Sequence, residues 1–212
     1  MKIGMIGSGN VAQTLAKGYL AKGHEVKLGT RDTTKFKDWI EKAGEKASVG
    51  SFAEAAKFGE IVFLSVPETA TNGAIELAGK ENLAGKILID LRNPMDFSQG
   101  IPPRFTVTFG NSLGEQVQCA LPETLVVKAF NSIGVEVMTD AQFGTDTATM
   151  FIAGNDAGAK SKVAALIGEF GWNVDDLGDI GQALYLEAFA SLWVNYGLKS
   201  GSREHAFKLL KR

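Results

Sequence analysis

Short apolar runs alternate along the chain with longer segments in which apolar residues recur at helical spacing. The short runs are typical of buried parallel strands, and the longer segments are typical of helices that cover a sheet. Val11, Leu15 and Tyr19, for example, place one apolar stripe along residues 10–22. The pattern predicts strands at residues 2–6, 24–29, 47–49, 60–66, 86–90, 125–130, 148–153 and 172–177. It predicts helices at residues 10–22, 34–43, 69–79, 111–120, 157–170 and 182–198, and a further short helix that begins at Ser51.

This alternation of strand and helix predicts an α/β fold, namely a Rossmann-type doubly wound, mostly parallel sheet. We expect residues 1–180 to form the nucleotide-binding domain and residues 181–212 to form a small C-terminal helical extension that is not an independent domain. Residues 182–198 are apolar on nearly every face. A helix of this kind is typically buried in a core or in a subunit interface. We therefore expect a homodimer. The tail at residues 202–212 is expected to be a short basic amphipathic helix.

Composition narrows the class of protein further. A chain of 212 residues with 45% hydrophobic content can bury one sizeable core, and a net charge of −2 without a block of like charge excludes nucleic-acid and membrane-surface partners. No apolar run has the length of a membrane span, and Met1 leads directly into the first strand without a signal peptide. The single cysteine, Cys119, excludes an internal disulfide and lies in an apolar run, where we expect it to be buried. These features predict a soluble, cytoplasmic protein.

The turn after the first strand carries the main chemical signal. Gly7, Gly9 and Ala12 are spaced as G-x-G-x-x-A, the pattern of a dinucleotide-binding turn. Gly7 permits the sharp turn, Gly9 lets a pyrophosphate approach the backbone, and Ala12 lets the helix pack against the strand. The start of the helix then offers unpaired N–H groups and a partial positive charge to the phosphates. The alternative is a turn that only connects a strand to a helix.

The end of the second predicted strand indicates which dinucleotide is bound. An NAD site has an Asp or Glu here, which bonds the ribose 2′-hydroxyl. This chain has Thr30 and Arg31, and a hydroxyl beside a guanidinium suits a 2′-phosphate. Lys35 opposes the dipole of the helix that follows, which a phosphate partner would explain. We therefore expect NADP(H), with Asp32 as a helix cap; in the alternative, Arg31 is solvated and Asp32 binds the ribose.

Turn-forming or polar residues also follow other buried strands, whose carboxyl ends border the cofactor crevice of a doubly wound sheet. The stretch Ser65-Val66-Pro67 follows one strand, and we expect it to lie along the adenosine–nicotinamide side of the cofactor. Asn93 follows another and opens a loop at residues 92–106 that holds three of the five prolines. A loop of that length in a compact domain is often functional, so Asn93 is a further cofactor-binding candidate. Lys128 lies within an apolar strand, so it either faces a site or lies on a solvated strand face.

Four stretches of the chain together resemble a known family. They are Met5-Ile6-Gly7-Ser8-Gly9-Asn10-Val11-Ala12, Gly29-Thr30-Arg31, Ser65-Val66-Pro67 and Lys128-Ala129-Phe130-Asn131. This set resembles the deazaflavin-dependent NADP oxidoreductases, and it is similar to the cytosolic oxidoreductase domain of the six-transmembrane metalloreductases. The resemblance implies a Rossmann domain with a small C-terminal extension that binds NADPH and passes hydride to a flavin or deazaflavin. It also implies pyrophosphate contacts at Ser8, Asn10 and Val11, 2′-phosphate contacts at Thr30 and Arg31, and nicotinamide contacts at Ala129 and Asn131.

Side chains suited to proton transfer are scarce. The two histidines, His24 and His205, lie far apart, and with one cysteine they cannot form a zinc site. Lys128 is the one residue we nominate for acid–base work, while Asp90 and Glu187 are conceivable acids without an identifiable partner. Hydride transfer between two bound rings requires orientation more than proton transfer, so this scarcity favours such a reaction.

The leading hypothesis is therefore an NADPH-dependent oxidoreductase whose second substrate is a flavin-like ring, such as FMN, FAD or a deazaflavin. One alternative is an NADP-dependent reductase of a small carbonyl or imine substrate, similar to the pyrroline-carboxylate reductases. The other is a non-catalytic NADP-binding sensor. No catalytic side chain is assigned, and the sequence does not identify the electron acceptor.

Overall fold

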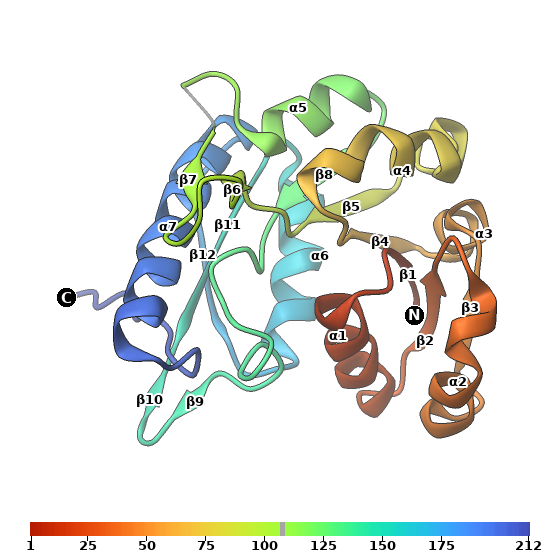
Figure 1. The fold of residues 1–212 in the computed structure, drawn as a ribbon, viewed down its shortest axis with the longest axis horizontal. Coiled ribbons are helices and arrows are strands. Elements are labelled where there is room, and N and C mark those ends of the chain that lie inside the picture. Colours follow the sequence, from red (N-terminus) through yellow and green to blue (C-terminus); the bar gives the residue numbers. More distant parts are fainter. Residues whose placement is uncertain (107–108) are drawn as a thin grey trace. The chain divides into compact units, whose positions relative to one another are not determined.

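The computed structural model describes residues 1–106 and 109–212, and the chain divides into two compact units (Figure 1). The first unit comprises residues 1–92 and 121–125. The second comprises residues 93–120 and 126–212. Each has strands with helices packed against them.

The first unit contains a parallel sheet with the strand order β3-β2-β1-β4-β5. The order of the strands along the chain reverses between β1 and β4, as in a doubly wound fold. In such sheets a crevice opens at the carboxyl ends of the strands on either side of the reversal, which makes it the expected ligand site. The strands are β1 (Lys2–Ile6), β2 (Glu25–Gly29), β3 (Ala47–Gly50), β4 (Ile61–Leu64) and β5 (Ile87–Asp90).

The helices of the first unit cover this sheet through small and apolar side chains. α1 (Asn10–Ala21) and α3 (Phe52–Phe58) both pack on β1 and β2. α3 begins at the predicted place with a capping box, in which Ser51 and Glu54 each accept a hydrogen bond from the other's backbone N–H. The remaining elements are η1 (Thr33–Phe36), α2 (Lys37–Ala43), η2 (Glu68–Ala70), α4 (Thr71–Ala78) and η3 (Lys80–Asn82).

The second unit is built on a mixed set of strands. β11 (Thr149–Gly154) runs antiparallel to β8 (Leu125–Lys128) and parallel to the edge strand β12 (Asn173–Asp176). α6 (Ala157–Gly168) and α7 (Ala183–Ser200) pack against β11. α5 (Leu113–Ala120) contacts both α7 and η4 (Ile180–Gln182). Two short hairpins complete the unit: β6 (Met95–Asp96) with β7 (Arg104–Phe105), and β9 (Gln142–Phe143) with β10 (Asp146–Thr147).

The predicted α/β class and doubly wound parallel sheet are confirmed, but two local predictions were wrong. Residues 202–212 form no helix; instead the Thr149 N–H donates to the Phe207 carbonyl at 2.8 Å, so the tail lies along β11. Cys119 is exposed, because the buried face of α5 passes through Leu113 and Val117 and leaves position 119 outside it. The boundary predicted near residue 180 stays a prediction.

Candidate functional site

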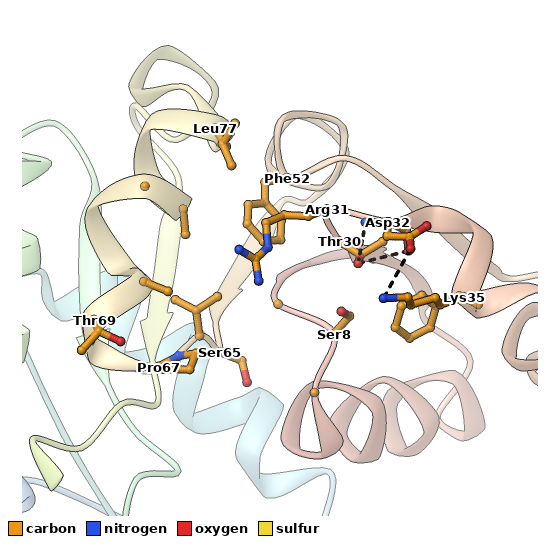
Figure 2. A pocket seen from close by; sticks show the side chains of 17 residues that line it. Ser8, Thr30, Arg31, Asp32, Lys35, Phe52, Ser65, Pro67, Thr69 and Leu77 are labelled. Carbon is orange, nitrogen blue, oxygen red and sulfur yellow. Dashed lines mark hydrogen bonds and ion pairs between the residues drawn. The ribbon is translucent and has the colours of Figure 1, made fainter. Parts of the chain in front are cut away.

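A cavity of about 800 Å³ lies in the first unit, at the carboxyl ends of β1, β2 and β4 (Figure 2). Its volume is in the range of small-molecule binding sites. The sequence-predicted residues that line it are Gly7, Ser8, Gly9, Thr30, Arg31, Lys35, Ser65, Val66 and Pro67. It is also lined by Asp32, Phe36, Phe52, Thr69, Ala70, Gly73, Ala74 and Leu77.

Gly7 is required by the fold itself. Its φ is +127°, in the region that favours glycine, and an added Cβ would lie 2.2 Å from the carbonyl oxygen of Ser65. Ser65 is held there because its N–H donates to the Ile6 carbonyl at 2.9 Å. The carboxyl ends of β1 and β4 therefore meet closely at the floor of the cavity.

Gly9 differs, because nothing in the chain occupies the space where its side chain would be. Its φ is −73°, and no heavy atom lies within 4 Å of an added Cβ. It immediately precedes α1, which begins at Asn10 and Val11 without a side-chain cap and without an acidic residue in its first turn. The first N–H groups of this helix thus lack helical partners, and the dipole favours an anion in front of them. An open approach to uncapped N–H groups suits a pyrophosphate.

The end of β2 presents a cation to the cavity. Thr30 is held in place because its N–H donates to the Gly50 carbonyl at 2.9 Å and its Oγ1 accepts from the Asp32 N–H at 3.2 Å. Arg31 is exposed and makes no hydrogen bond or ion pair with any residue that the structure describes. Figure 2 shows its guanidinium turned into the cavity. Arg31 is therefore available to an anionic ligand.

Asp32, by contrast, is already engaged within the chain. Its Oδ1 accepts from the Thr34 hydroxyl at 2.6 Å and from the Thr34 N–H at 3.1 Å, which confirms the predicted cap. These hydrogen bonds, the hydroxyl's first, lower the pKa of the Asp32 carboxyl, and Lys35 adds to the effect. Lys35 Nζ lies 3.4 Å from Asp32 Oδ2, so a phosphate is not needed to explain the lysine at this position. The geometry favours Arg31 over Asp32 as the residue that contacts a ribose substituent.

One wall of the cavity was missed at the sequence level. It is formed by η2 and α4, where Ala70, Gly73, Ala74 and Leu77 line the cavity together with Thr69. The spacing of i, i+3, i+4 and i+7 places the four residues on one face of a helix. That spacing was visible in the sequence, but small residues at these positions equally suit a face packed against protein.

A buried network fixes the loop at the base of this wall. The Arg92 guanidinium donates two hydrogen bonds to Asp90, from Nε to Oδ1 at 2.6 Å and from Nη2 to Oδ2 at 3.1 Å, and its Nη1 donates to Thr71 Oγ1 at 2.5 Å. The Thr71 hydroxyl lies 3.5 Å from the carbonyl oxygen of Pro67, which it can reach as a donor. Asp90, which had no identifiable partner in the sequence, thus helps to set the position of the Pro67 turn.

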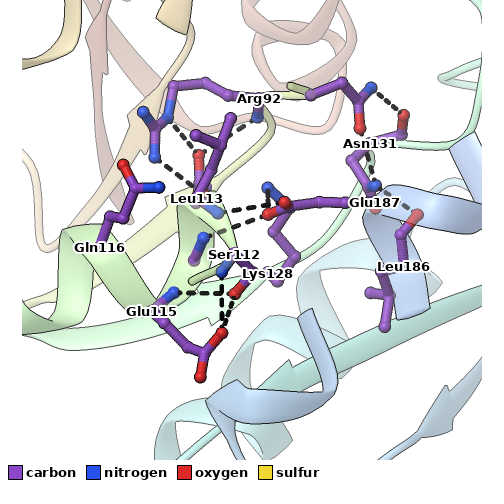
Figure 3. A network of polar contacts seen from close by, with 12 residues as sticks. Arg92, Ser112, Leu113, Glu115, Gln116, Lys128, Asn131, Leu186 and Glu187 are labelled. Carbon is purple, nitrogen blue, oxygen red and sulfur yellow. Dashed lines mark hydrogen bonds and ion pairs between the residues drawn. The ribbon is translucent and has the colours of Figure 1, made fainter. Parts of the chain in front are cut away.

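The remaining predicted residues, Asn93, Ala129 and Asn131, lie in the second unit. Asn93 Nδ2 donates to the Asn131 carbonyl at 2.6 Å, and Asn131 Nδ2 donates to Asn93 Oδ1 at 3.0 Å and to the Leu186 carbonyl at 2.8 Å (Figure 3). Between Ala129 and Asn131, Phe130 has a φ of +58°, the only positive φ among described non-glycine residues. A strained, buried turn of this kind is often found at functional sites.

Lys128 is fully buried, so the expectation of a solvated strand face was wrong, and it is not among the residues that line the described cavity. Its Nζ lies 2.7 Å from Glu187 Oε1, and both side chains are fully buried. Glu187 also accepts hydrogen bonds from the N–H groups of Leu113 at 3.0 Å and Gly114 at 3.1 Å, at the start of α5 (Figure 3). The lysine is part of an internal ion pair, which the distance between these residues in the sequence concealed.

Two classes of site are absent from the part of the chain that the structure describes. No group of three or more His, Cys, Asp or Glu side chains there is arranged to hold a metal ion. No helix of residues 1–106 or 109–212 has the length and hydropathy needed to cross a bilayer.

Comparison with known proteins identifies relatives over the whole chain. Residues 2–94 match the family model described as NADP oxidoreductase, coenzyme F420-dependent. The F420-dependent NADP reductase of Methanocaldococcus jannaschii is 30% identical over 215 residues, which cover 96% of this chain and 95% of that protein. Metalloreductase STEAP3 of Rattus norvegicus is 28% identical over 187 residues, which cover 88% of this chain and 36% of that longer protein. A crystal structure of a candidate F420-dependent NADP-reductase from Arthrobacter sp. FB24 aligns over 100% of both chains, with 37% identity and a TM-score of 0.93.

Proposed function

Because the chain belongs to the family of coenzyme F420-dependent NADP oxidoreductases, we propose that it transfers hydride between NADP(H) and a deazaflavin or related flavin-like acceptor. That the chain is an NADP-dependent oxidoreductase follows from the family. The acceptor is the proposed part. The acceptor is proposed from the relatives, and the observation that supports NADP(H) as the hydride donor is one cavity that combines the uncapped start of α1 with the unpartnered guanidinium of Arg31.

The phosphate groups of NADP(H) are assigned to two walls of this cavity. The pyrophosphate lies over Gly9 and accepts hydrogen bonds from the first N–H groups of α1, where Asn10 and Val11 begin the helix. The 2′-phosphate binds Arg31 and Thr30, and Lys35 contributes positive charge. Because the Asp32 carboxylate already accepts two hydrogen bonds from Thr34, it does not compete for the ribose.

The remaining contacts orient the reactive half of the cofactor. The stretch Ser65-Val66-Pro67 follows β4 and supports the cofactor between its adenosine and nicotinamide ends. Asn93, Ala129 and Asn131 are assigned to the nicotinamide, where the paired asparagine amides hold each other's orientation. When bound, NADPH supplies the hydride, and these residues hold the ring that donates it.

A flavin-like acceptor is favoured over a carbonyl or imine by relatives that match nearly the whole chain and are named as F420-dependent NADP reductases. Hydride transfer between two rings depends mainly on their orientation, whereas carbonyl reduction also draws on a positioned proton donor.

Stopped-flow oxidation of NADPH tests this proposal, with deazaflavin, FMN, FAD and riboflavin offered as acceptors in parallel. We expect turnover with the deazaflavin above the rate of any mixture without enzyme, and a slower rate with NADH as donor. Tight NADPH binding without turnover of any acceptor would contradict the proposal. It would favour the carbonyl or imine reductase if such substrates are reduced, and the sensor if they are not. The homodimer and the cytoplasmic location stay predictions.

A further inference from the structure

α7 carries a large share of the apolar surface that the chain exposes. Four large apolar side chains of this helix are exposed: Tyr185, Leu192, Tyr196 and Leu198. On all the other α-helices that the structure describes there is one, Leu77. Before Lys199, α7 exposes no charge at all, because its Glu187 is buried in the pair with Lys128. An uncharged, apolar helix surface of this kind is typical of an interaction site.

Most of this surface lies on one side of the helix. Tyr185, Ala188, Leu192 and Tyr196 are all exposed and recur at the spacing of one helix face, which we call the α7 face. The buried residues of α7 lie on its other side, and the helix packs against β11 and α5 (Figure 1). The α7 face is therefore left over after the helix has been packed into its own unit.

The two tyrosines of the α7 face are held in place by neighbouring rings. The Tyr185 ring lies edge-on to the Phe109 ring, with centroids 6.3 Å apart, and the Tyr196 ring lies edge-on to the His205 ring at 4.7 Å. Aromatic side chains are enriched at protein–protein interfaces, and side chains that are already ordered lose less freedom when a partner binds. These contacts prepare the α7 face for a protein partner.

The order of side-chain sizes on the α7 face fits a second copy of the same face. When two α7 helices pack antiparallel with a two-fold axis at Leu192, residues equally far from Leu192 on its two sides meet. Ala188 of one copy then lies opposite Tyr196 of the other, so that small and large side chains interdigitate, and no like charges meet. We infer that the α7 face is an isologous interface, through which two copies of this chain pair with antiparallel α7 helices.

The exposed area is sufficient for such a pair. Phe109, beside Tyr185, is 80% exposed, and the two tyrosines are 54% and 55% exposed. At about 150–250 Å² for each aromatic side chain, these three rings present about 300–450 Å² per copy and about 600–900 Å² in a pair. Leu192, Ala188 and the residues around them add to this, which brings the total to the roughly 1,000 Å² that a specific interface needs. The structure thereby gives the expected homodimer a defined surface.

Leu192 provides a test that depends on the two-fold axis. Leu192→Asp places two carboxylates against each other in the pair, and Leu192→Lys places two ammonium groups there. Either variant should raise the dissociation constant of the dimer by about 100-fold or more, because like charges that face each other at an interface repel strongly. An equimolar mixture of the two variants should form a dimer again, since each carboxylate then meets an ammonium group. Sedimentation equilibrium measures the masses, with wild type expected at twice the chain mass of 22.6 kDa.

Leu198→Lys is the matched control. Leu198 is 46% exposed on the same helix, but it lies about 120° around the helix from Leu192 and outside the α7 face. This variant should dimerise as tightly as wild type. Because both leucines are exposed, all three variants should keep the far-UV circular dichroism spectrum of wild type, which shows that they are folded.

Each contrary result removes a different part of the inference. A wild-type chain that sediments as a monomer throughout the micromolar range would overturn it and would assign the α7 face to a different protein. A Leu192→Asp dimer as tight as that of wild type, or a dimer lost equally in Leu198→Lys, would place the interface elsewhere. Two monomeric Leu192 variants that fail to associate when mixed would refute the two-fold axis at Leu192. None of these results depends on NADPH, so the proposed function is tested separately.

Discussion

The ammonium nitrogen of Lys128 lies 2.7 Å from the carboxylate of Glu187, and solvent reaches neither side chain. Two backbone N–H groups at the start of α5 also donate to this carboxylate. The pair therefore joins β8, α7 and α5 inside the second unit. Its charges compensate each other only while both are present, since a buried charge without a partner is costly.

Lys128→Met should lower the free energy of unfolding by about 3–5 kcal/mol, because Glu187 would be left as a buried carboxylate without its cation. Urea denaturation measures the change. Lys199→Met is the control, since Lys199 is exposed at the end of α7. Adding Glu187→Gln to the Lys128 variant should recover part of the loss. A Lys128 variant as stable as the control would show that the pair contributes nothing.

The two glycines of the turn after β1 should respond in opposite ways to substitution. Gly7→Ala should destabilise the protein by about 3 kcal/mol or more, because the position has a positive φ and a carbonyl oxygen where the methyl would be. Gly9→Val should melt near the wild-type temperature and fail to bind both NADPH and NADH, because its side chain would fill the space assigned to the pyrophosphate. Thermal unfolding and fluorescence titration measure the two effects. Retained NADPH binding by Gly9→Val would refute the assignment of the pyrophosphate.

Arg31→Ala should raise the dissociation constant for NADPH by about 10- to 100-fold and change that for NADH far less. A charge-assisted hydrogen bond of this kind contributes about 1.5–3 kcal/mol, and each 1.4 kcal/mol corresponds to a factor of ten. Lys42→Ala controls for a change in surface charge, since Lys42 is exposed in α2 and does not line the cavity. Equal losses for the two nucleotides would place the 2′-phosphate elsewhere.

Thr34→Val should raise the pKa of Asp32 toward its ordinary value of 3.8, because the Thr34 hydroxyl is the largest cause of the lowered pKa. In wild type the ionised Asp32 carboxylate stabilises the fold at pH values above its unfolded-state pKa. This stabilisation is lost as the pH falls through the lower, folded-state pKa. The variant should lose less stability than wild type over the same fall in pH. A titration of the Asp32 carboxyl resonance by NMR measures the pKa, with the exposed neighbour Thr33→Val as control. An unshifted pKa in Thr34→Val would contradict the assigned cause.

The fold and much of the cavity followed from local patterns in the sequence. Apolar runs located the parallel strands, and the ends of those strands supplied Gly7, Arg31 and Ser65 as site candidates. This succeeds because the carboxyl ends of neighbouring parallel strands converge at one edge of a sheet. The Asp32 cap was also predictable, because a cap depends on residues two or three positions away.

The predictions that were wrong or missed concern features that depend on residues distant in the sequence. Cys119 and the tail at residues 202–212 were judged by local composition, but their environment is set by which face of α5 is buried and by a backbone bond from Thr149 to Phe207. The α4 wall was overlooked because small residues at helical spacing are the same whether protein or ligand lies against them.

By itself, the sequence determined the doubly wound class, the dinucleotide turn and the NADP preference, since each depends on residues that are close along the chain or on strand ends that must converge. Only the tertiary structure decided that Lys128 is paired with Glu187, that Arg92 joins Asp90 to Thr71, and that α4 closes the cavity. These relationships join residues that are distant in sequence, and no local pattern encodes which of many distant partners a side chain meets. Packing alone selects that partner.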